Sequence, residues 1–204
     1  MTPILRTIVK IASLTFALNY AKTVASSVYS ISLVALFDMN KPLRVSIQTD
    51  DFDLAAEIAS LRAQDGRIGA VCSFVGTVRD RSAGEPGRAA PGSIQSMELE
   101  HYPGMTEKSI EAMIDAAHQR FDIFGTRVIH RVGLLQPLDQ IVMVAVTSAH
   151  RGESFAACEF LMDYLKTQAP FWKKEETPQG ARWVDARVSD DAALAKWGIS
   201  ASNA

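Results

Sequence analysis

Residues 141–177, IVMVAVTSAHRGESFAACEFLMDYLKTQAPFWKKEET, decide the fold. The run at 141–146 is apolar, short and rich in β-branched residues, which predicts a buried strand. A polar turn follows it, and then a segment whose apolar residues recur at helical spacing, which predicts a helix with one apolar face. These apolar residues are Phe155, Cys158, Met162 and Leu165. Pro170 ends the helix, because proline has no N–H to donate and restricts the residue before it.

Cationic side chains stand at both ends of this helix. His150 and Arg151 occupy its start, where free amides attract anions and a guanidinium can bind phosphate with two hydrogen bonds. Lys166 lies on its last turn, and Lys173 follows the proline. A helix of about 16 residues spans about 24 Å. Its two ends can therefore contact the same ligand only if both face a shared groove or a partner. The residues alone predict an anion-binding domain with candidate reactive lysines; solvated surface charges are the alternative interpretation.

Composition limits the class of protein. A chain of 204 residues with 48% hydrophobic content can bury one sizeable core, so one domain is expected. The formal net charge of −2 argues against a general nucleic-acid binder. Cys72 and Cys158 lie in apolar runs, and no CxxC or paired Cys/His spacing is present. They are therefore expected to be small buried hydrophobic residues in a reducing compartment, without a disulfide framework or a zinc site.

The first 37 residues are apolar, rich in Ser and Ala, and nearly free of acids. We expect Met39 to be the natural start, with residues 1–38 as an extension outside the fold, 39–204 as the domain, and a cytoplasmic location. Arg6 and Lys10 before the apolar run leave a signal peptide open as an alternative, besides a membrane anchor and an unassigned extension. N-terminal sequencing of the native protein distinguishes these alternatives.

The rest of the chain alternates strand and helix patterns. Strands are expected at 44–47, 68–78, 93–101 and 127–132, with a hairpin of 173–177 and 182–184 around the turn 178–180. Helices are expected at 52–63, 106–121 and, more briefly, from Asp190 to Trp197.

Local signals add detail to this pattern. Asp50 or Asp51 is expected to cap the first helix, and Gly66 to stop it. Strand 93–101 is expected to pair with strand 68–78, and the Gly/Pro-rich residues 80–93 to form a mobile surface loop. Most connections between strands are too short for parallel crossovers, so the predicted class is α+β with a largely antiparallel sheet and flanking helices.

Six motifs then occur in order along the chain: 100–107 (EHYPGMTE), 129–133 (IHRVG), 147–151 (TSAHR), 162–167 (MDYLKT), 169–175 (APFWKKE) and 182–187 (RWVDAR). Together they closely resemble the large, catalytic subunit of molybdopterin synthase, and the resemblance covers residues 41–197. It implies an α/β-hammerhead-like fold and a sulfurtransferase of molybdenum cofactor biosynthesis. Two departures are the long loop at 80–93 and the extension before Met39.

The resemblance also implies the reaction and its partners. Cyclic pyranopterin monophosphate receives two sulfurs and becomes the dithiolene of molybdopterin. The donor is the C-terminal glycine thiocarboxylate of a small ubiquitin-like subunit, whose tail enters a pocket of the large subunit. The family forms a homodimer that carries two small subunits, a heterotetramer. Neither a cofactor nor a metal is expected.

Carried over by motif, the resemblance assigns Lys166 and Lys173 as catalytic residues, with Lys166 the more critical. Arg79, His150 and Arg151 are expected to hold the phosphate. The full set expected to contact substrate is Thr77, Val78, Arg79, His150, Arg151, Lys173, Lys174, Glu175 and Arg187. Of these, Arg187 is expected to reach the neighbouring subunit's site.

Two other classes of function compete with this assignment. A sulfurtransferase that works through a cysteine persulfide needs an activated thiol, whereas Cys72 and Cys158 have no adjacent cations. A non-catalytic binding module for a ubiquitin-like tail would keep the groove without the lysines. The presence of both Lys166 and Lys173 argues against such a module.

Overall fold

The structure, a computed structural model, describes residues 43–63, 65–80, 93–184 and 196–198. The expected boundary at Met39, residues 81–92 of the expected loop, Arg187 and most of the expected terminal helix lie outside the described residues. Within the described part of the chain, no helix is both long and apolar enough to cross a membrane.

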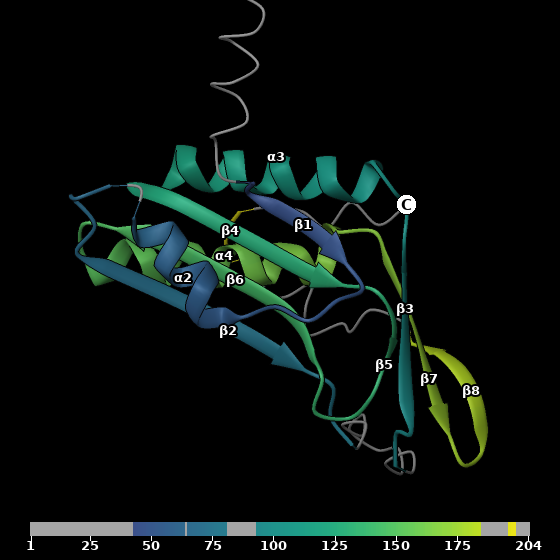
Figure 1. Cartoon of the computed structure of the whole chain (residues 1–204). Helices are drawn as coiled ribbons and strands as arrows, with labels where there is room; N and C mark the ends of the chain where they lie inside the picture. Colours follow the sequence, from purple (N-terminus) through teal and green to yellow (C-terminus); the bar gives the residue numbers. More distant parts are fainter. Residues whose placement is uncertain (1–42, 64, 81–92, 185–195, 199–204) are drawn as a thin grey trace, which may run out of the picture. The chain divides into compact units, whose positions relative to one another are not determined.

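Among the described residues, the first of two four-stranded sheets, which has the longer strands, has the strand order β1-β4-β6-β2 (Figure 1). Its strands are β1 (Val45–Gln48), β4 (Ile123–Arg131), β6 (Gln140–Ser148) and β2 (Ala70–Thr77). Strand β1 runs parallel to β4, and the other two pairs are antiparallel. In the described part of the chain the helices that cover the sheet are α2 (Leu54–Arg62), α3 (Met105–Arg120) and α4 (Arg151–Gln168).

Strand β6 lies in the middle of the core and is buried on both faces. Val142, Val144 and Val146 belong to a hydrophobic cluster with α3 and α4, whereas Met143 and Ala145 belong to a cluster on the α2 side. A strand covered on both faces needs apolar residues at every position, which explains the unbroken run at 141–146. The buried strand predicted from this run is confirmed.

A second sheet, with the order β5-β3-β7-β8, is antiparallel throughout. It consists of β5 (Gly133–Leu135), β3 (Ser96–His101), β7 (Phe171–Thr177) and β8 (Gly180–Val184). The predicted hairpin is β7–β8, and Gly180 supplies its turn at φ +112°. The predicted pairing of the 93–101 strand with the 68–78 strand is wrong, because β3 pairs with β5 and β7. The α+β class with mostly antiparallel sheets and flanking helices is confirmed.

Two predictions about helix ends are also wrong. Asp53, rather than Asp50 or Asp51, caps α2, since its carboxylate accepts hydrogen bonds from two first-turn amides at 2.8 and 3.1 Å. The helix ends at Arg62, and its C-cap residue, Ala63, has right-handed helical backbone angles. Gly66 therefore lies beyond the end of the helix and does not stop it. Asp50, Asp51 and Asp53 all carry a carboxylate that can cap a helix, so the capping position was ambiguous in the sequence.

The apolar face of α4 differs in part from its prediction. Cys158 and Leu165 are buried, but the Phe155 side chain is 60% exposed. The face that packs on the sheet is instead completed by Ala157, Phe160 and Leu161.

Candidate active site

A pocket of about 380 Å³ opens between the C-terminal end of α4 and the inner face of the second sheet. Three cationic side chains line it: Arg79 just after β2, Lys166 on the last turn of α4, and Lys173 on β7. Its apolar walls include Phe74 and Phe171. In such a site the cations can bind an anionic group and the aromatic walls can pack against a flat ring.

The break at Pro170 brings the two lysines together. Helix α4 ends at Gln168, Ala169 is already extended, and β7 begins at Phe171. The chain therefore turns directly from the helix into the strand that forms the far wall of the pocket. Lys166 is exposed, whereas Lys173 is half-buried.

Glu175 holds Lys173 in place from the same face of β7, two residues further along the strand. The Glu175 side chain is buried, with 4% of its surface exposed. One carboxylate oxygen lies 3.4 Å from Nζ of Lys173, and the other accepts a hydrogen bond from Arg182 at 3.0 Å. The two cations offset the cost of burying the negative charge of this carboxylate, and the carboxylate in turn fixes the position of the Lys173 ammonium group.

The other residues expected near Arg79 do not line the pocket. Val78 is 1% exposed; its N–H donates to the Asp139 carbonyl at 2.9 Å and its carbonyl accepts from Leu138 at 2.8 Å. Thr77 is exposed and follows a register shift in the β2–β6 ladder. Val78 thus anchors the chain segment from which Arg79 reaches the pocket.

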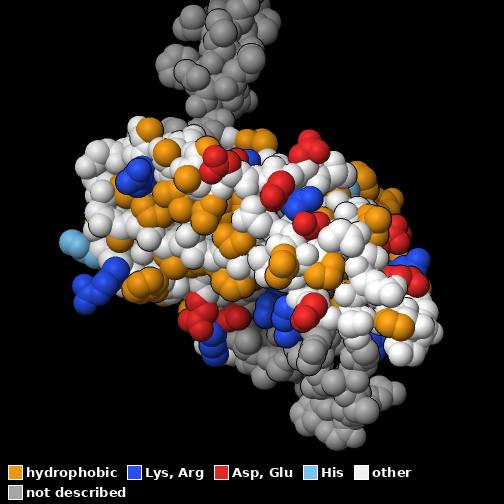
Figure 2. All heavy atoms as spheres, turned by 60° about the horizontal axis from the view of Figure 1, so that its bottom comes forward, with side chains coloured by type: hydrophobic (Ala, Val, Ile, Leu, Met, Phe, Trp, Pro, Cys, Tyr) orange, Lys and Arg blue, Asp and Glu red, His pale blue; other side chains and the backbone are white. Residues whose placement is uncertain are grey.

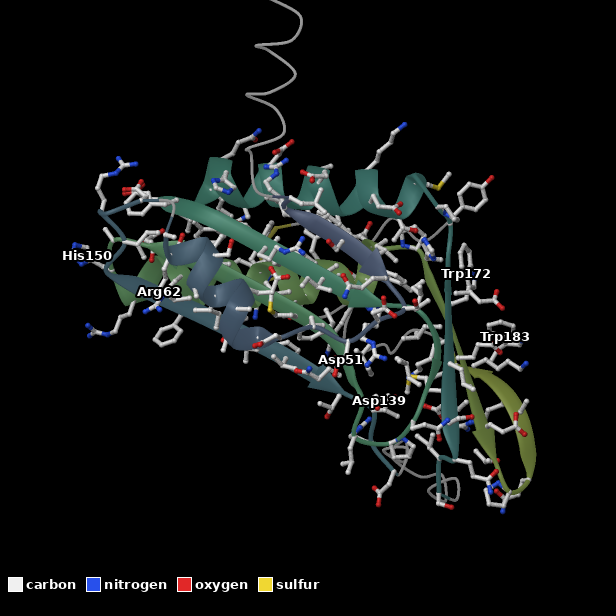
Figure 3. The ribbon with its side chains drawn as sticks, in the orientation of Figure 1. Asp51, Arg62, Asp139, His150, Trp172 and Trp183 are labelled. Carbon is white, nitrogen blue, oxygen red and sulfur yellow. The ribbon has the colours of Figure 1, made fainter. Side chains whose placement is uncertain are left out.

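Lys174 lies on the outer face of the second sheet. Its ammonium group is 3.5 Å from Glu98 and 5.9 Å from the centre of the Trp183 ring. Trp172 and Trp183 project from that outer face together (Figure 3). Because side chains alternate along a strand, Lys174 points away from the pocket that Lys173 lines.

His150 and Arg151 lie at the opposite end of α4 from the lysines. This helix has 18 residues and is therefore about 27 Å long. His150 is its N-cap residue, and both side chains are exposed. Figure 3 shows His150 far from Trp172, the neighbour of Lys173. Within a single chain, the expected meeting of His150 and Arg151 with the lysines does not occur.

His130 lines the pocket, although no role is predicted for this residue in the sequence analysis. Its ring stacks on Phe171 with centroids 3.8 Å apart and an interplanar angle of 18°. Its Nδ1 is 2.8 Å from the Arg131 carbonyl oxygen, so Nδ1 carries the proton of the neutral ring. Burial lowers the pKa of His130 to about 4, and the nearby His101 also lowers it. The IHRVG motif at 129–133 contains His130, and this was the feature of the sequence that could have identified it as a site residue.

This buried imidazole predicts a pH-dependent stability. The pKa of His130 is about 4 when folded, against 6.5 for the ordinary side chain. The unfolded chain therefore takes up the proton first, so the stabilisation is complete above pH 6.5 and is lost as the pH falls toward 4. Between pH 7 and pH 5 we expect a loss of about 2 kcal/mol. Urea unfolding at both pH values, with His130→Gln as control, measures it; an equal loss in the variant contradicts the assignment.

The two cysteines are neighbours in the structure. Cys158 on α4 is buried and its Sγ lies 3.9 Å from the Val144 carbonyl oxygen. Burial, together with a smaller effect of the adjacent Cys72, raises the pKa of Cys158 to about 12. A thiol in this state is a poor nucleophile at neutral pH.

We therefore expect the double variant Cys72→Ser, Cys158→Ser to keep its turnover within about a factor of two. The measurement is product formation per folded molecule, with folding checked by circular dichroism because the positions are in or near the core. Abolished turnover in a folded variant would restore the persulfide alternative.

Comparison with known proteins identifies the family of this chain. The family model described as MoaE protein matches residues 47–168. The chain belongs to the MoaE family. A molybdopterin synthase catalytic subunit from Ralstonia nicotianae is 62% identical over 160 residues, which cover 78% of this chain and 87% of that relative.

Solved structures of MoaE relatives share the fold. The molybdopterin biosynthesis MoaE protein from Burkholderia ambifaria superposes with a TM-score of 0.64 at 58% identity, covering 76% of this chain and 98% of that one. A structure from Helicobacter pylori, described as a complex of subunits 1 and 2 of molybdopterin-converting factor, has a TM-score of 0.56 at 19% identity, covering 71% and 92%. At that identity it supports the fold alone.

Family membership confirms the resemblance inferred from the six motifs. This MoaE family member is a sulfurtransferase, and its activity is sulfur transfer in molybdenum cofactor biosynthesis.

Proposed function

We propose that the pocket lined by Arg79, Lys166 and Lys173 is where sulfur passes from a thiocarboxylated small subunit to cyclic pyranopterin monophosphate. The observation that carries this proposal is the convergence of three cations from three separate elements on one cavity with aromatic walls. The cations suit the phosphate and the thiocarboxylate, and the walls suit a pterin ring.

The chemistry requires these charges. In each transfer the thiocarboxylate sulfur forms a C–S bond with a carbon of the pterin side chain while a C–O bond to that carbon breaks; the oxygen leaves with the opening phosphate ester at one carbon and as water at the other. Water then cleaves the resulting thioester, which leaves the sulfur on the pterin and releases the tail as a carboxylate. The cyclic phosphate ester opens during the reaction, so negative charge has to be held while protons move. We assign the phosphate to Arg79, and the reacting centre to Lys166 and Lys173.

Glu175 has a supporting role in this proposal. Its buried carboxylate holds Nζ of Lys173 at 3.4 Å and so keeps that ammonium aimed at the pocket. Lys174 faces the opposite side of the sheet, where it pairs with Glu98. Direct contact of Lys174 with the same substrate molecule is therefore not part of the proposal.

The sulfur donor is proposed to be a small ubiquitin-like subunit. Relatives that are 62% and 51% identical are named as the catalytic subunit of molybdopterin synthase, and an enzyme with a catalytic subunit has at least one further subunit, which supports a partner of this kind. A C-terminal glycine tail is thin and extended, and such a tail can enter a pocket of about 380 Å³ beside a flat substrate.

We also propose a homodimer, because it gives His150 and Arg151 a route to substrate. Among the described strands, β2 has a neighbour on the β6 side alone, so its other edge presents unpaired backbone groups. Phe74 on β2 is 41% exposed, and hydrophobic side chains gather across the left and centre of the view toward this edge (Figure 2). A second copy of the chain is the occupant that we propose for this edge.

Antiparallel pairing of β2 with the β2 strand of a second copy would place the start of each strand beside the end of the other. The start of β2, at Ala70, is in register with Ser148, two residues before His150. The end of β2, at Thr77, leads to Arg79 in the pocket. His150 and Arg151 of one copy would then approach the pocket of the other, and Arg187 is proposed to act across the same interface.

A cytoplasmic location is proposed on the chemistry of the cysteines. Cys72 and Cys158 are neighbours and both are free thiols. Adjacent thiols persist in the reducing cytosol, whereas oxidising compartments favour disulfides.

The experiment that tests the proposed function is reconstitution. Purified protein is mixed with the thiocarboxylated small subunit and cyclic pyranopterin monophosphate, and the dithiolene product is measured. The matched control is the same small subunit with an ordinary C-terminal carboxylate, which carries no sulfur and should give no product. Absence of dithiolene with the thiocarboxylated subunit contradicts the proposal.

A further inference from the structure

We propose that Nε2 of His130 accepts a hydrogen bond from an N–H group of the pterin ring and thereby orients the substrate in the pocket. This inference rests on the proposed function and adds a specificity contact to it. The argument depends on the tautomer of His130, the surroundings of its Nε2, and the chemistry of the other lining residues.

The structure determines which ring nitrogen is the acceptor. Nδ1 lies 2.8 Å from the Arg131 carbonyl oxygen, which can only accept, so Nδ1 is the donor. A neutral imidazole carries one N–H, and Nε2 therefore keeps its lone pair. Stacking on Phe171 at 3.8 Å fixes the plane in which that lone pair points.

Nε2 is open to the pocket. No N–H or O–H group of the described residues donates to it. It is also not one of the side-chain atoms that are sealed from solvent without a partner. Because the ring lines the cavity and Nδ1 is engaged with the backbone, the free acceptor is available to a molecule in the cavity.

The other polar side chains of the described lining cannot supply this contact. Arg79, Lys166 and Lys173 carry donors and no acceptor. They can bind phosphate, thiocarboxylate and ring carbonyl groups, but they leave the N–H groups of a reduced pterin unpaired. An N–H group that is shielded from water without an acceptor is costly, so one well-placed acceptor favours the binding of a ring that bears N–H groups.

His130 acts here as an acceptor and not as a base. Its pKa of about 4 keeps the ring neutral at physiological pH. A neutral ring neither repels the three cations nor carries a proton away from the substrate. The expected consequence of losing Nε2 is weaker substrate binding with little change in the rate constant of the bound complex.

Two substitutions separate the acceptor from the structural role of the ring. His130→Asn places an amide N–H near Nδ1 and can keep the bond to Arg131, but it has no group at Nε2. His130→Gln places an amide oxygen near Nε2 and keeps an acceptor. We expect His130→Asn to raise KM and Kd for cyclic pyranopterin monophosphate by about five- to tenfold. His130→Gln should stay within about threefold of the unsubstituted protein.

Inorganic phosphate serves as a second probe. It interacts with the cations and has no N–H, so its affinity should be the same in both variants. Equal loss of pterin affinity in His130→Asn and His130→Gln, or no loss in His130→Asn, overturns the inference. If thermal unfolding shows that His130→Asn does not fold, His130→Phe, which keeps a ring to stack on Phe171, replaces it with the same expected loss.

The outcome is separable from a failure of the proposed function. If the unsubstituted protein forms no dithiolene with the thiocarboxylated subunit, the proposed function fails, whatever the variants do. If the unsubstituted protein is active and His130→Asn has the same KM, the function stands and the His130 contact is wrong.

Discussion

Lys166→Ala is expected to lower the rate of molybdopterin formation by a factor of about a hundred or more. Lys166 is the cation at the end of α4 that lines the pocket together with Arg79 and Lys173. The ammonium group is proposed to hold the thiocarboxylate or to move a proton at the reacting carbon, and alanine does neither. Its side chain is exposed, so the free energy of unfolding should change by less than about 0.5 kcal/mol.

The measurement is a single-turnover reconstitution with saturating thiocarboxylated subunit, together with thermal unfolding. Lys108→Ala is the matched control, because Lys108 is also an exposed helical lysine and lies on α3 outside the pocket lining. The control should retain full activity. Near-normal product formation by Lys166→Ala would remove Lys166 from the catalytic assignment.

Lys166→Arg distinguishes the two roles proposed for this lysine. Arginine keeps the positive charge but does not release a proton in proteins. Substantial activity in Lys166→Arg indicates that charge is what the reaction needs. Activity as low as that of Lys166→Ala indicates that the proton matters.

The fold could be predicted where one segment carried its own signal. The run at 141–146 has no polar position, and β6 is indeed covered on both faces. The break at Pro170 and the turn at Gly180 are local backbone constraints, so the end of α4 and the β7–β8 hairpin followed from them.

Strand pairing could not be predicted in the same way. Strands β2 and β3 are consecutive in the chain, but they join different sheets, because Met97 and Leu99 pack with Leu135 in a separate core. The partner of a strand depends on contacts that are distant in sequence, which an alternating pattern does not encode. The exposed position of Phe155 has the same origin: helical spacing gives a face, but not its width.

The candidate site divides along similar lines. Lys166 and Lys173 were placed together by motif, and the turn at Pro170 gives the physical reason for their proximity. His130 was missed, because a histidine inside a strand pattern gives no sign of which cavity its ring will meet. The separation of His150 from the lysines follows from the length of α4, and a single sequence does not show whether a second copy closes the distance.

Arg151→Ala is expected to lose at least about a hundredfold in product formation, and a mixture with Lys166→Ala is expected to regain activity. Both expectations rest on the proposed homodimer, in which each pocket takes its lysines from one chain and His150 and Arg151 from the other. In a mixed dimer, one pocket carries both substitutions and the other carries neither. With random assortment half of the dimers are mixed, so activity should return to about a quarter of the unsubstituted level.

Co-expression of the two variants with different affinity tags gives the random mixture, the tags are used to measure the fraction of mixed dimers, and product formation by the whole mixture is measured with the thiocarboxylated subunit. The matched control pairs Lys166→Ala with Lys173→Ala. These lysines line the same pocket of the same chain, so every pocket of that mixed dimer lacks one of them and no activity should return. Recovery in the control, or none in the Arg151→Ala mixture despite folded mixed dimers, contradicts sharing of the site between copies. The contrast holds even if the absolute rates of the single variants differ, because both mixtures contain the same Lys166→Ala chain.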